Sequence, residues 1–521
     1  MARKKAKTQN DTPAKKPKVK RGISRASAST KSKNTLRQIK VVSSAANGSR
    51  SKSWMVNDLK DEKFVLNPAV SSKVAKLCNL WKSEKKFTDS VVELDPVPFK
   101  HCVVKKLLKD ESNLTDVCAE LFKLPYHTML NDLYSCQQSC LLDLDDSYPN
   151  LRSIVNFIKG PLHSLVQEVT GKKFSNKFTI TASQYKFTDR LLCHDDNLHD
   201  RSVAFIFYLC KDWREQFGGS LDLFDCDVHN QPHKVVKSIF PSYGSFSFFE
   251  VTHNSYHQVS EVLTSKSVRL SINGWYHGED LPEQVAWHAS LPKMTTPIQP
   301  RGCSLDKFIS ETWQDDKTNA QVKSCFEKEL SISLPKFLDS SVFADIENAL
   351  RDGDIVWEHS GPANHRRYEI AKPASLPGMV SQYLKIIQSK EWFRFLSECT
   401  VEISPDVKPK PKCWVEVQRW QPGDYTVLVD NDPLNDNTGI DVHLYFGVGK
   451  RKKKSQGGEV FYLGPDRDDQ GNLEQAFHLE PENNTATIIA HIEGMAVLTK
   501  YLDHRNKPFY KIFARYSQTA E

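Results

Sequence analysis

Two histidines and an aspartate form the most chemically suggestive group in the sequence. His194 and Asp196 stand two residues apart in the segment 191–196 (LLCHDD), and His257 follows about sixty residues later in 255–259 (SYHQV). Residues i and i+2 of a strand face the same way, so His194 and Asp196 are expected to reach one metal ion together from one strand or its end. Two imidazoles and one carboxylate leave the opposite side of the ion open, which suits Fe(II) and oxygen chemistry.

Arg269 follows His257 by twelve residues, in the alternating segment 268–272 (VRLSI). Alternation places it on the face of Ser271, opposite Leu270 and Ile272. An arginine inside a β-barrel is costly unless it holds an anion, and a guanidinium binds a carboxylate through two parallel hydrogen bonds. The far carboxylate of 2-oxoglutarate is such an anion. Tyr208, in the apolar segment 205–209 (FIFYL), can place its hydroxyl beside the same carboxylate.

Each of these residues alone has an ordinary explanation. An isolated H-x-D pair recurs by chance, a single histidine is most often a plain surface or core residue, and a single arginine is most often an ion-pair partner. His253 competes with His257 for the third ligand position. The spacing to Arg269 favours His257, and the joint pattern predicts an iron and 2-oxoglutarate site.

The sequence around these residues predicts leading helices and then many short strands. Apolar residues recur at helical spacing in 71–87, 113–140 and 150–170, and short apolar runs separated by polar or glycine turns fill 178–277. This order is typical of a β-barrel or jelly roll with helical support. Helical spacing returns at 319–351 and strand-like runs at about 413–515, so the second half repeats the order of the first.

The bulk composition bounds the class of protein. A chain of 521 residues is too long for one ordinary domain, and 39% hydrophobic residues are enough to build cores. No run of about 18 apolar residues is present, so we expect no membrane span. The net charge of +7 is uneven, because the first fifty residues hold fifteen Lys or Arg and one acid.

Residues 1–50 are predicted to be a disordered basic tail, since they have almost no large apolar residues to bury. The basic clusters at 3–5 and 15–21 are typical of a nuclear import signal or a nucleic-acid-binding arm. A solubilising tail that does neither is the plain alternative. The remaining chain is divided into a catalytic domain at 51–288, a linker at 289–318 and a second domain at 319–521.

Several segments together resemble one family. They are 183–196, 218–223 (GGSLDL), 248–251 (FFEV), 256–262 (YHQVSEV) and 269–275 (RLSINGW), and they resemble the 2-oxoglutarate- and iron-dependent prolyl hydroxylases of the ribosomal type, which include the yeast termination-and-polyadenylation protein and its animal counterparts. The resemblance covers nearly the whole chain beyond the tail. It implies an α+β, mainly β fold with two tandem double-stranded β-helix (jelly-roll) domains, of which only the first is catalytic.

The resemblance also implies an activity and its site. The activity would be 3-hydroxylation of a proline in the decoding-centre protein of the small ribosomal subunit, with effects on translation termination and stress responses, in nucleus and cytoplasm. Iron(II) would be bound by His194, Asp196 and His257, and 2-oxoglutarate by Tyr208 and Arg269. Tyr185 falls where related enzymes have another tyrosine near the co-substrate. L-ascorbate would restore over-oxidised iron.

The second half of the sequence has a segment with the same spacing as the motif of the first half, but without the metal-ligating residues. The segment 427–432 (VLVDND) followed by Gly457-Gly458 parallels 191–196 followed by Gly218-Gly219. Asp430 stands where the first half has a histidine, and by simple spacing Val497 and Phe509 fall at the third-ligand and anchor positions. We therefore expect no catalytic iron there, and a role in packing, substrate presentation or partner binding.

Other functions remain compatible with the same residues. The same chemistry could act on a lysine, a different proline or RNA, because every such enzyme shares the iron site. A non-catalytic adaptor or RNA-binding protein, associated with RNA or translation factors, is the alternative from another class. The basic tail supports it, whereas a complete set of ligands with Arg269 argues against it.

Overall fold

The computed structural model describes residues 63–282, 292–302, 304–400, 410–429, 432, 438–449, 456–467 and 473–517. The predicted tail at 1–50, Asp430 and parts of the predicted linker at 289–318 lie outside the described residues. The described chain is mainly β with helices, which confirms the predicted class. Within these ranges no helix has the length and apolarity needed to cross a bilayer.

Helices and short strands precede the residues singled out above. They are α1 (Pro68–Ser71), α2 (Val74–Lys82), β1 (Phe87–Thr88), β2 (Val92–Asp95), β3 (His101–Val104), α3 (Leu114–Leu121), β4 (Tyr126–Leu130), β5 (Tyr134–Ser139), α4 (Pro149–Phe157), η1 (Ile158–Leu162) and α5 (His163–Thr170). The predicted helix at 113–140 is therefore wrong beyond Leu121. Asn131 accepts hydrogen bonds from the backbone N–H groups of Leu133 and Tyr134, and this turn closes a β-hairpin instead.

Eight strands between 178 and 277 form what we call the first strand set. They are β6 (Phe178–Tyr185), β7 (Arg190–His194), β8 (Arg201–Tyr208), β9 (Leu221–Cys226), β10 (Pro232–Ile239), β11 (Phe246–Glu250), β12 (His257–Val259) and β13 (Arg269–His277), with a short helix η2 (Glu215–Phe217) between β8 and β9. The pairing orders are β11-β8-β13-β6 and β7-β12-β9-β10. Strand β5 pairs with both β6 and β7 and so joins the two groups.

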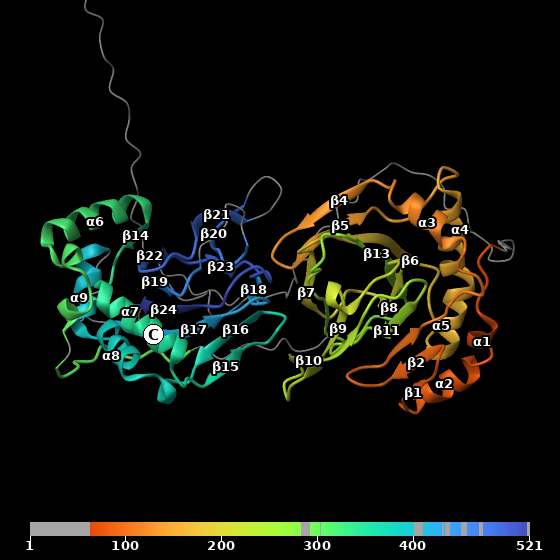
Figure 1. Ribbon diagram of the computed structural model, residues 1–521, viewed down its shortest axis with the longest axis horizontal. Coiled ribbons are helices and arrows are strands. Elements are labelled where there is room, and N and C mark those ends of the chain that lie inside the picture. Colours follow the sequence, from red (N-terminus) through yellow and green to blue (C-terminus); the bar gives the residue numbers. More distant parts are fainter. Residues whose placement is uncertain are drawn as a thin grey trace, which may run out of the picture. The chain divides into compact units, whose positions relative to one another are not determined.

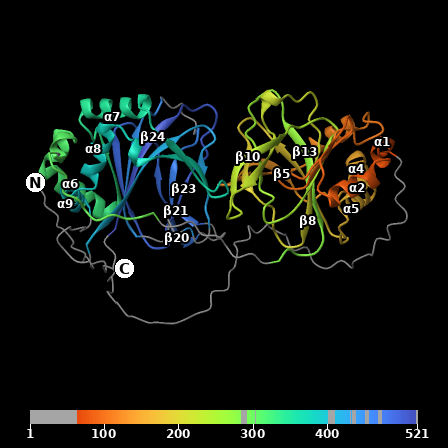
Figure 2. The same ribbon diagram turned by 90° about the horizontal axis from the view of Figure 1, so that it is seen from below.

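Alternation along β13 separates two environments. Leu270, Ile272 and Tyr276 are buried in an apolar core together with residues of α4 and α5 such as Ile154 and Val166. Helices α1, α2, α4 and α5 gather on this side of the strands (Figure 1 and Figure 2). The intervening residues, Arg269 among them, face the other way, as the sequence predicted.

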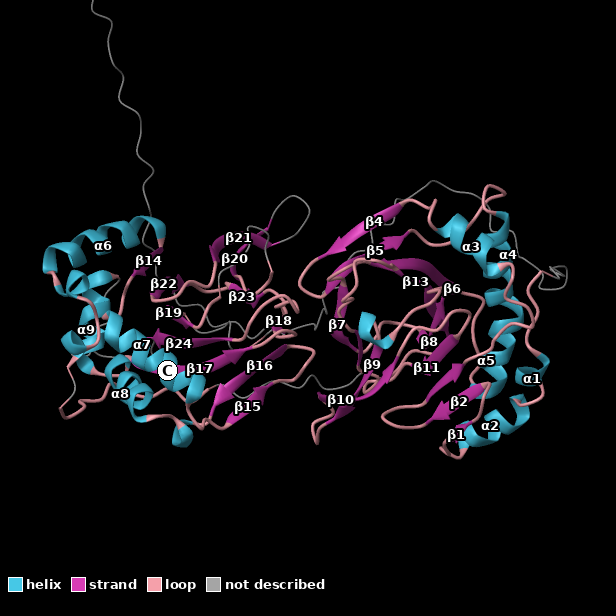
Figure 3. Ribbon diagram, viewed as in Figure 1, coloured by secondary structure: helices cyan, strands magenta, loops and turns pink. Residues whose placement is uncertain are grey.

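The second half has its own helices and strands. Short helices η3 (Leu305–Lys307) and η4 (Glu311–Gln314) lead to α6 (Asp316–Glu329), β14 (Ser331–Pro335), α7 (Ser340–Asp352), β15 (Trp357–Ser360), β16 (Arg366–Ala371), η5 (Pro373–Ser375), α8 (Gly378–Ile387) and α9 (Lys390–Cys399). The helical spacing noted at 319–351 thus corresponds to α6 and α7, whereas α8 and α9 were not predicted. Helices α6 to α9 gather beside the strands that follow (Figure 3).

Eight further strands form the second strand set. They are β17 (Lys412–Trp420), β18 (Tyr425–Thr426), β19 (Gly439–Phe446), β20 (Val460–Arg467), β21 (Leu473–Leu479), β22 (Thr485–His491), β23 (Ala496–Thr499) and β24 (Phe509–Ser517). Their pairing orders, β22-β19-β24-β17 and β21-β20-β23, repeat those of β11-β8-β13-β6 and β10-β9-β12 in the first set. Both sets lie in one unit of the chain.

Gly274 tests how tightly β13 is held between its neighbours. A Cβ added at Gly274 would lie 1.9 Å from the carbonyl oxygen of Thr179 on β6, so backbone would have to move. We expect Gly274→Ala to lower the free energy of unfolding by about 3 kcal/mol, measured by thermal or urea unfolding of the full chain. Gly160→Ala is the control, because a Cβ there meets nothing within 4 Å. Equal stability of the two variants would contradict this packing.

Candidate metal and co-substrate site

His194 and His257 face each other across two paired strands. His194 is the last residue of β7 and His257 the first of β12, and the antiparallel register sets them directly opposite one another. Their ring centroids are 4.2 Å apart. Strand pairing therefore brings together two imidazoles that are far apart in sequence.

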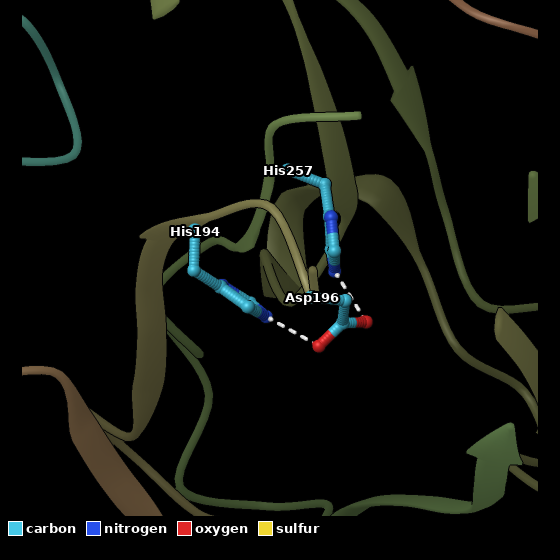
Figure 4. Close-up of side chains that lie close together, drawn as sticks. All are labelled: His194, Asp196 and His257. Carbon is cyan, nitrogen blue, oxygen red and sulfur yellow. Dashed lines mark ion pairs between the residues drawn. The ribbon is translucent and has the colours of Figure 1, made fainter. Parts of the chain in front are cut away.

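Asp196 reaches the histidines by a route that the sequence did not predict. Strand β7 ends at His194, so Asp196 lies just past the end of the strand and alternation does not orient it, whereas the expected meeting of His194 and Asp196 is confirmed. The backbone at Asp196 is left-handed, with φ of 61°. Its carboxylate thereby lies with Oδ1 3.5 Å from Nε2 of His194 and Oδ2 3.4 Å from Nε2 of His257 (Figure 4). Aspartate is one of the few non-glycine residue types that adopt this conformation readily.

Hydrogen bonds to the backbone fix how both imidazoles present their nitrogens. Nδ1 of His194 lies 2.8 Å from the carbonyl oxygen of Leu192, and Nδ1 of His257 lies 2.8 Å from that of Ser255. A carbonyl oxygen only accepts, so each Nδ1 carries the proton and each Nε2 keeps its lone pair in the neutral ring. With the Asp196 carboxylate this makes three ligand atoms within 4.8 Å of one another.

Electrostatics favour a cation at this point. Burial would raise the pKa of Asp196, but hydrogen bonds and charge from His194 and His257 outweigh burial and hold that pKa well below its usual value. Burial would lower the pKa of His194, and Asp196 reverses the effect and raises it. A buried carboxylate that stays ionised beside two imidazoles is a donor set that fits Fe(II).

Two further side chains hold the Asp196 carboxylate, and the sequence analysis missed both. The indole Nε1 of Trp275 donates to Oδ2 over 3.0 Å, and Nη1 of Arg201 lies 3.5 Å from Oδ1. The Arg201 guanidinium stacks on the Trp275 ring at 3.6 Å. Alternation from Arg269 through Ser271 could have placed Trp275 on this face, whereas nothing in the sequence signals Arg201.

Arg269 and Tyr208 offer unsatisfied donors. Arg269 is 1% exposed, and its Nε donates to the carbonyl oxygen of Gly219 over 2.6 Å. Within the described ranges no protein acceptor is bonded to its two terminal nitrogens, and the buried hydroxyl of Tyr208 has no hydrogen-bond partner. Buried donors of this kind are costly unless an acceptor reaches them, and a carboxylate fits both.

Tyr185 lies beside the same guanidinium. It is the β6 partner of Arg269, and its ring centroid is 5.0 Å from the guanidinium carbon, against 5.3 Å for the Tyr208 ring. Two aromatic rings therefore flank the cation and restrict its orientation. A direct contact of Tyr185 with the co-substrate stays a prediction.

Close neighbours explain why the Gly-Gly motif at 218–219 has no side chains. Gly219 has φ of +68°, and a Cβ on it would lie 2.9 Å from Cδ of Arg269. At Gly218, with φ of +67°, a Cβ would lie 2.1 Å from the carbonyl oxygen of Glu261. Both positions need glycine, and the second lets the arginine pass.

His253 and a second cluster do not compete with this site. His253 Nδ1 is 2.9 Å from Nδ2 of Asn197, outside the three-ligand group. Glu261, Asp503 and His504 also bring ligand atoms together, but His504 Nδ1 is bonded to Glu261 over 2.7 Å and Arg505 to Asp503 over 3.1 Å. These groups satisfy one another without a metal.

Sheet register locates the equivalent positions in the second strand set. His257 pairs with Leu223 on β9 and Val497 pairs with Tyr462 on β20, at equivalent steps after the Gly-Gly motifs. Arg269 and Phe509 each open a nine-residue strand and pair with Tyr185 and Trp420, the last residues of β6 and β17. Register thus agrees with the placement of Val497 and Phe509 by spacing. Asp432, at the place of Asp196, forms an ion pair with Arg366.

Comparison with known proteins gives two family matches and similar relatives. Residues 180–277 match the family described as "2OG-Fe(II) oxygenase superfamily", and residues 301–521 match "Oxoglutarate and iron-dependent oxygenase degradation C-term". The chain is 28% identical to the prolyl 3-hydroxylase OGFOD1 of Mus musculus, over 83% of this chain and 90% of the relative. It is 29% identical to the prolyl 3-hydroxylase sudestada1 of Drosophila melanogaster, over 83% of this chain and 85% of the relative.

A solved structure is also similar. A prolyl hydroxylase of Trichoplax adhaerens, in complex with a peptide fragment of the hypoxia inducible factor oxygen degradation domain, matches with a TM-score of 0.32 and 17% identity. The match covers 40% of this chain and 93% of that one.

Removal of a metal ligand should abolish metal binding. We expect His194→Ala and Asp196→Ala to lose bound iron in anaerobic Fe(II) titration and to release no succinate from 2-oxoglutarate, because two donors cannot hold the ion that three bind. His253→Ala, the rival histidine, is the matched control and should keep both properties. Succinate release at the wild-type rate from either ligand variant would refute the site.

Gly219→Ala should weaken the co-substrate anchor without touching the metal ligands. The added Cβ would displace the Arg269 side chain, so we expect the KM for 2-oxoglutarate to rise about tenfold or more while Fe(II) affinity stays within about twofold. Gly302→Ala is the matched control, since Gly302 also has a positive φ of +71° but nothing within 4 Å of the added atom. An unchanged KM for 2-oxoglutarate would show that Gly219 does not determine how Arg269 binds the co-substrate.

Proposed function

We propose that this chain, which belongs to the 2-oxoglutarate- and iron-dependent prolyl hydroxylases, 3-hydroxylates a proline in the decoding-centre protein of the small ribosomal subunit. One observation carries the enzyme class: the first strand set and its β7–β8 loop bring three metal-ligating atoms within 4.8 Å of one another, and the same strands hold a buried, unsatisfied arginine–tyrosine pair. A purely structural role would not explain all of these groups together.

The described residues divide the work of the reaction. Bound iron, with 2-oxoglutarate and dioxygen, supplies the oxidant that inserts one oxygen atom into a C–H bond, while the second oxygen atom ends in succinate and carbon dioxide leaves. His194, Asp196 and His257 would hold the ion through one side of its coordination shell. Arg269 and Tyr208 would hold the distal carboxylate of 2-oxoglutarate, and so fix its keto end toward the metal.

The support around Asp196 would keep this geometry rigid. The Trp275 N–H and the Arg201 guanidinium occupy acceptor positions of the carboxylate that the metal does not need. The carbonyl oxygens of Leu192 and Ser255 hold the two imidazole rings in the tautomer that leaves Nε2 free. Such outer contacts set the orientation of ligands and hence metal affinity.

The two strand sets would be two double-stranded β-helix domains, of which only the first is catalytic. Their matching pairing orders support a duplication. Val497 in place of His257, and Arg366 neutralising Asp432, support the absence of iron from the second. The second domain would then serve packing, substrate presentation or partner binding.

The finer parts of the proposal rest on the family resemblance of the sequence motifs, and the names of the relatives support only the C3 position among them. These parts are the C3 position, the ribosomal target, an effect on translation termination and stress response, a need for L-ascorbate, and action in nucleus and cytoplasm. An import role for the basic tail at 1–50 is proposed from its basic clusters, together with indirect association with RNA or translation factors.

The substrate assignment can be tested directly. Full-length protein with Fe(II), 2-oxoglutarate and ascorbate should add one oxygen atom to the proline of a peptide from the decoding-centre loop, as read by tandem mass spectrometry and by amino-acid analysis for 3-hydroxyproline. A peptide with that proline replaced by alanine and the His194→Ala enzyme are the controls. If no ribosomal peptide is modified while 2-oxoglutarate still turns over, the target is another residue or RNA.

A further inference from the structure

The interior of the second strand set contains a cavity of about 80 Å³ that is lined by both charged and apolar side chains. Side chains from β16, β17, β19, β20, β23 and β24 line it, and those that matter here are Trp420, Asp441, His443, Tyr462, Lys511 and Arg515. One water molecule needs roughly 10–15 Å³ by this measure, so the cavity has room for a small organic molecule.

Lys511 is an unpaired cation in this cavity. The residue is 5% exposed, and within the described ranges no acceptor forms a hydrogen bond or ion pair with its Nζ. The rings of Trp420 and Phe513 lie 5.6 and 5.3 Å from it. Burial lowers the pKa of Lys511 to about 8, although the charges of Glu416 and Asp441 oppose this. A buried ammonium without a partner is costly, and a bound anion would remove that cost.

The other charged residues that line the cavity are already neutralised. Arg515 binds Asp441 through two hydrogen bonds of 2.6 and 2.8 Å, and Arg366 pairs with Asp432. Among the lining residues there are three basic side chains and two acidic ones, so Lys511 is the lining cation without an acidic lining partner. The nearby Glu416 acts on Lys511 as a charge, but its Oε2 accepts hydrogen bonds from Gln418 over 2.7 Å and from Tyr368 over 3.4 Å.

A second lining residue also has an unsatisfied atom. The Tyr462 hydroxyl lies 2.8 Å from Asp441, to which it donates, and 2.6 Å from His443 Nε2, from which it accepts. The proton of His443 is therefore on Nε2, which leaves the buried Nδ1 as an acceptor without a partner. His443 Nδ1 is itself enclosed, so the group that the cavity offers to an anion is the Lys511 ammonium.

Register relates Lys511 to the anchor of the first strand set. Lys511 pairs with Tyr445 on β19, just as Ser271 pairs with Tyr208 on β8. Lys511 therefore stands two residues along the strand from Phe509, which occupies the position of Arg269. In the second set the inward-facing cation therefore stands two residues further along its strand than Arg269 does in the first set.

We propose that this cavity binds a small monocarboxylate through Lys511. A lysine offers a point charge, which one carboxylate balances, whereas phosphate binding usually uses several donors or a free guanidinium. The two arginines here are engaged by aspartates, so among the lining residues the Lys511 ammonium is the cation left to bind a ligand. The aromatic rings of Trp420 and Phe513 suit the short apolar part of such a ligand.

Propionate is a suitable probe, tested on the metal-free full chain. Arg269→Met serves as the parent variant, so that the anchor of the first strand set cannot bind the probe. We expect saturation-transfer NMR to show propionate bound to the parent. Adding Lys511→Met should weaken binding at least tenfold, whereas adding Lys385→Met, an exposed lysine of α8, should leave it unchanged.

Three results would overturn the proposal. They are no propionate signal from the parent, an unchanged signal after Lys511→Met, and displacement of propionate by inorganic phosphate at equal concentration, which would mean a general anion site. Folding is checked separately by the melting temperatures of Lys511→Met and Lys511→Gln. Removal of an unpaired buried charge should leave these at or above the parent value, and a marked fall in both would show that Lys511 is already satisfied within the protein.

Discussion

The two-sided character of β13 is the constraint on which the first strand set depends. One face of this strand lies in the apolar core formed with α4 and α5, and the other carries Arg269 and Trp275. Because β13 pairs with β6 on one edge and β8 on the other, it cannot slip without moving apolar residues out of that core. The apolar core with the helices thereby fixes where Arg269 and Trp275 stand along β13 relative to the neighbouring strands.

The metal ligands come from the other group of strands. Pairing of β7 with β12 sets His194 opposite His257, and β5 ties this group to β6. Asp196 belongs to neither strand and is held by Trp275 of β13 and by Arg201 of β8. Asp196 thus contacts side chains of both groups of strands. A shift of one group relative to the other would therefore separate the metal ligands.

Sequence reasoning succeeded where a local rule decides the structure. Alternation placed Arg269 opposite Leu270 and Ile272, and spacing after the Gly-Gly motifs placed Val497 and Phe509 at positions that strand register supports. It failed where tertiary contacts decide. The hairpin of β4 and β5 was taken for helix, and the left-handed turn at Asp196 and the contact of Arg201 depend on residues distant in sequence.

The two strand sets compensate buried charge in different ways. In the first set the interior holds a carboxylate between two imidazoles and an arginine with free donors, an arrangement that a cation and an anion from solution would complete. In the second set Arg515 binds Asp441 through two hydrogen bonds of 2.6 and 2.8 Å, which is closer than the 3.5 Å between Arg201 and Asp196 in the first set. A close arginine pair offsets more of the charge of the carboxylate, so Asp441 has less need of an external cation than Asp196 has. Among the described residues Lys511 is the exception to this self-neutralisation, because no acceptor is bonded to its Nζ. This unpaired interior cation is the basis of the proposed monocarboxylate site.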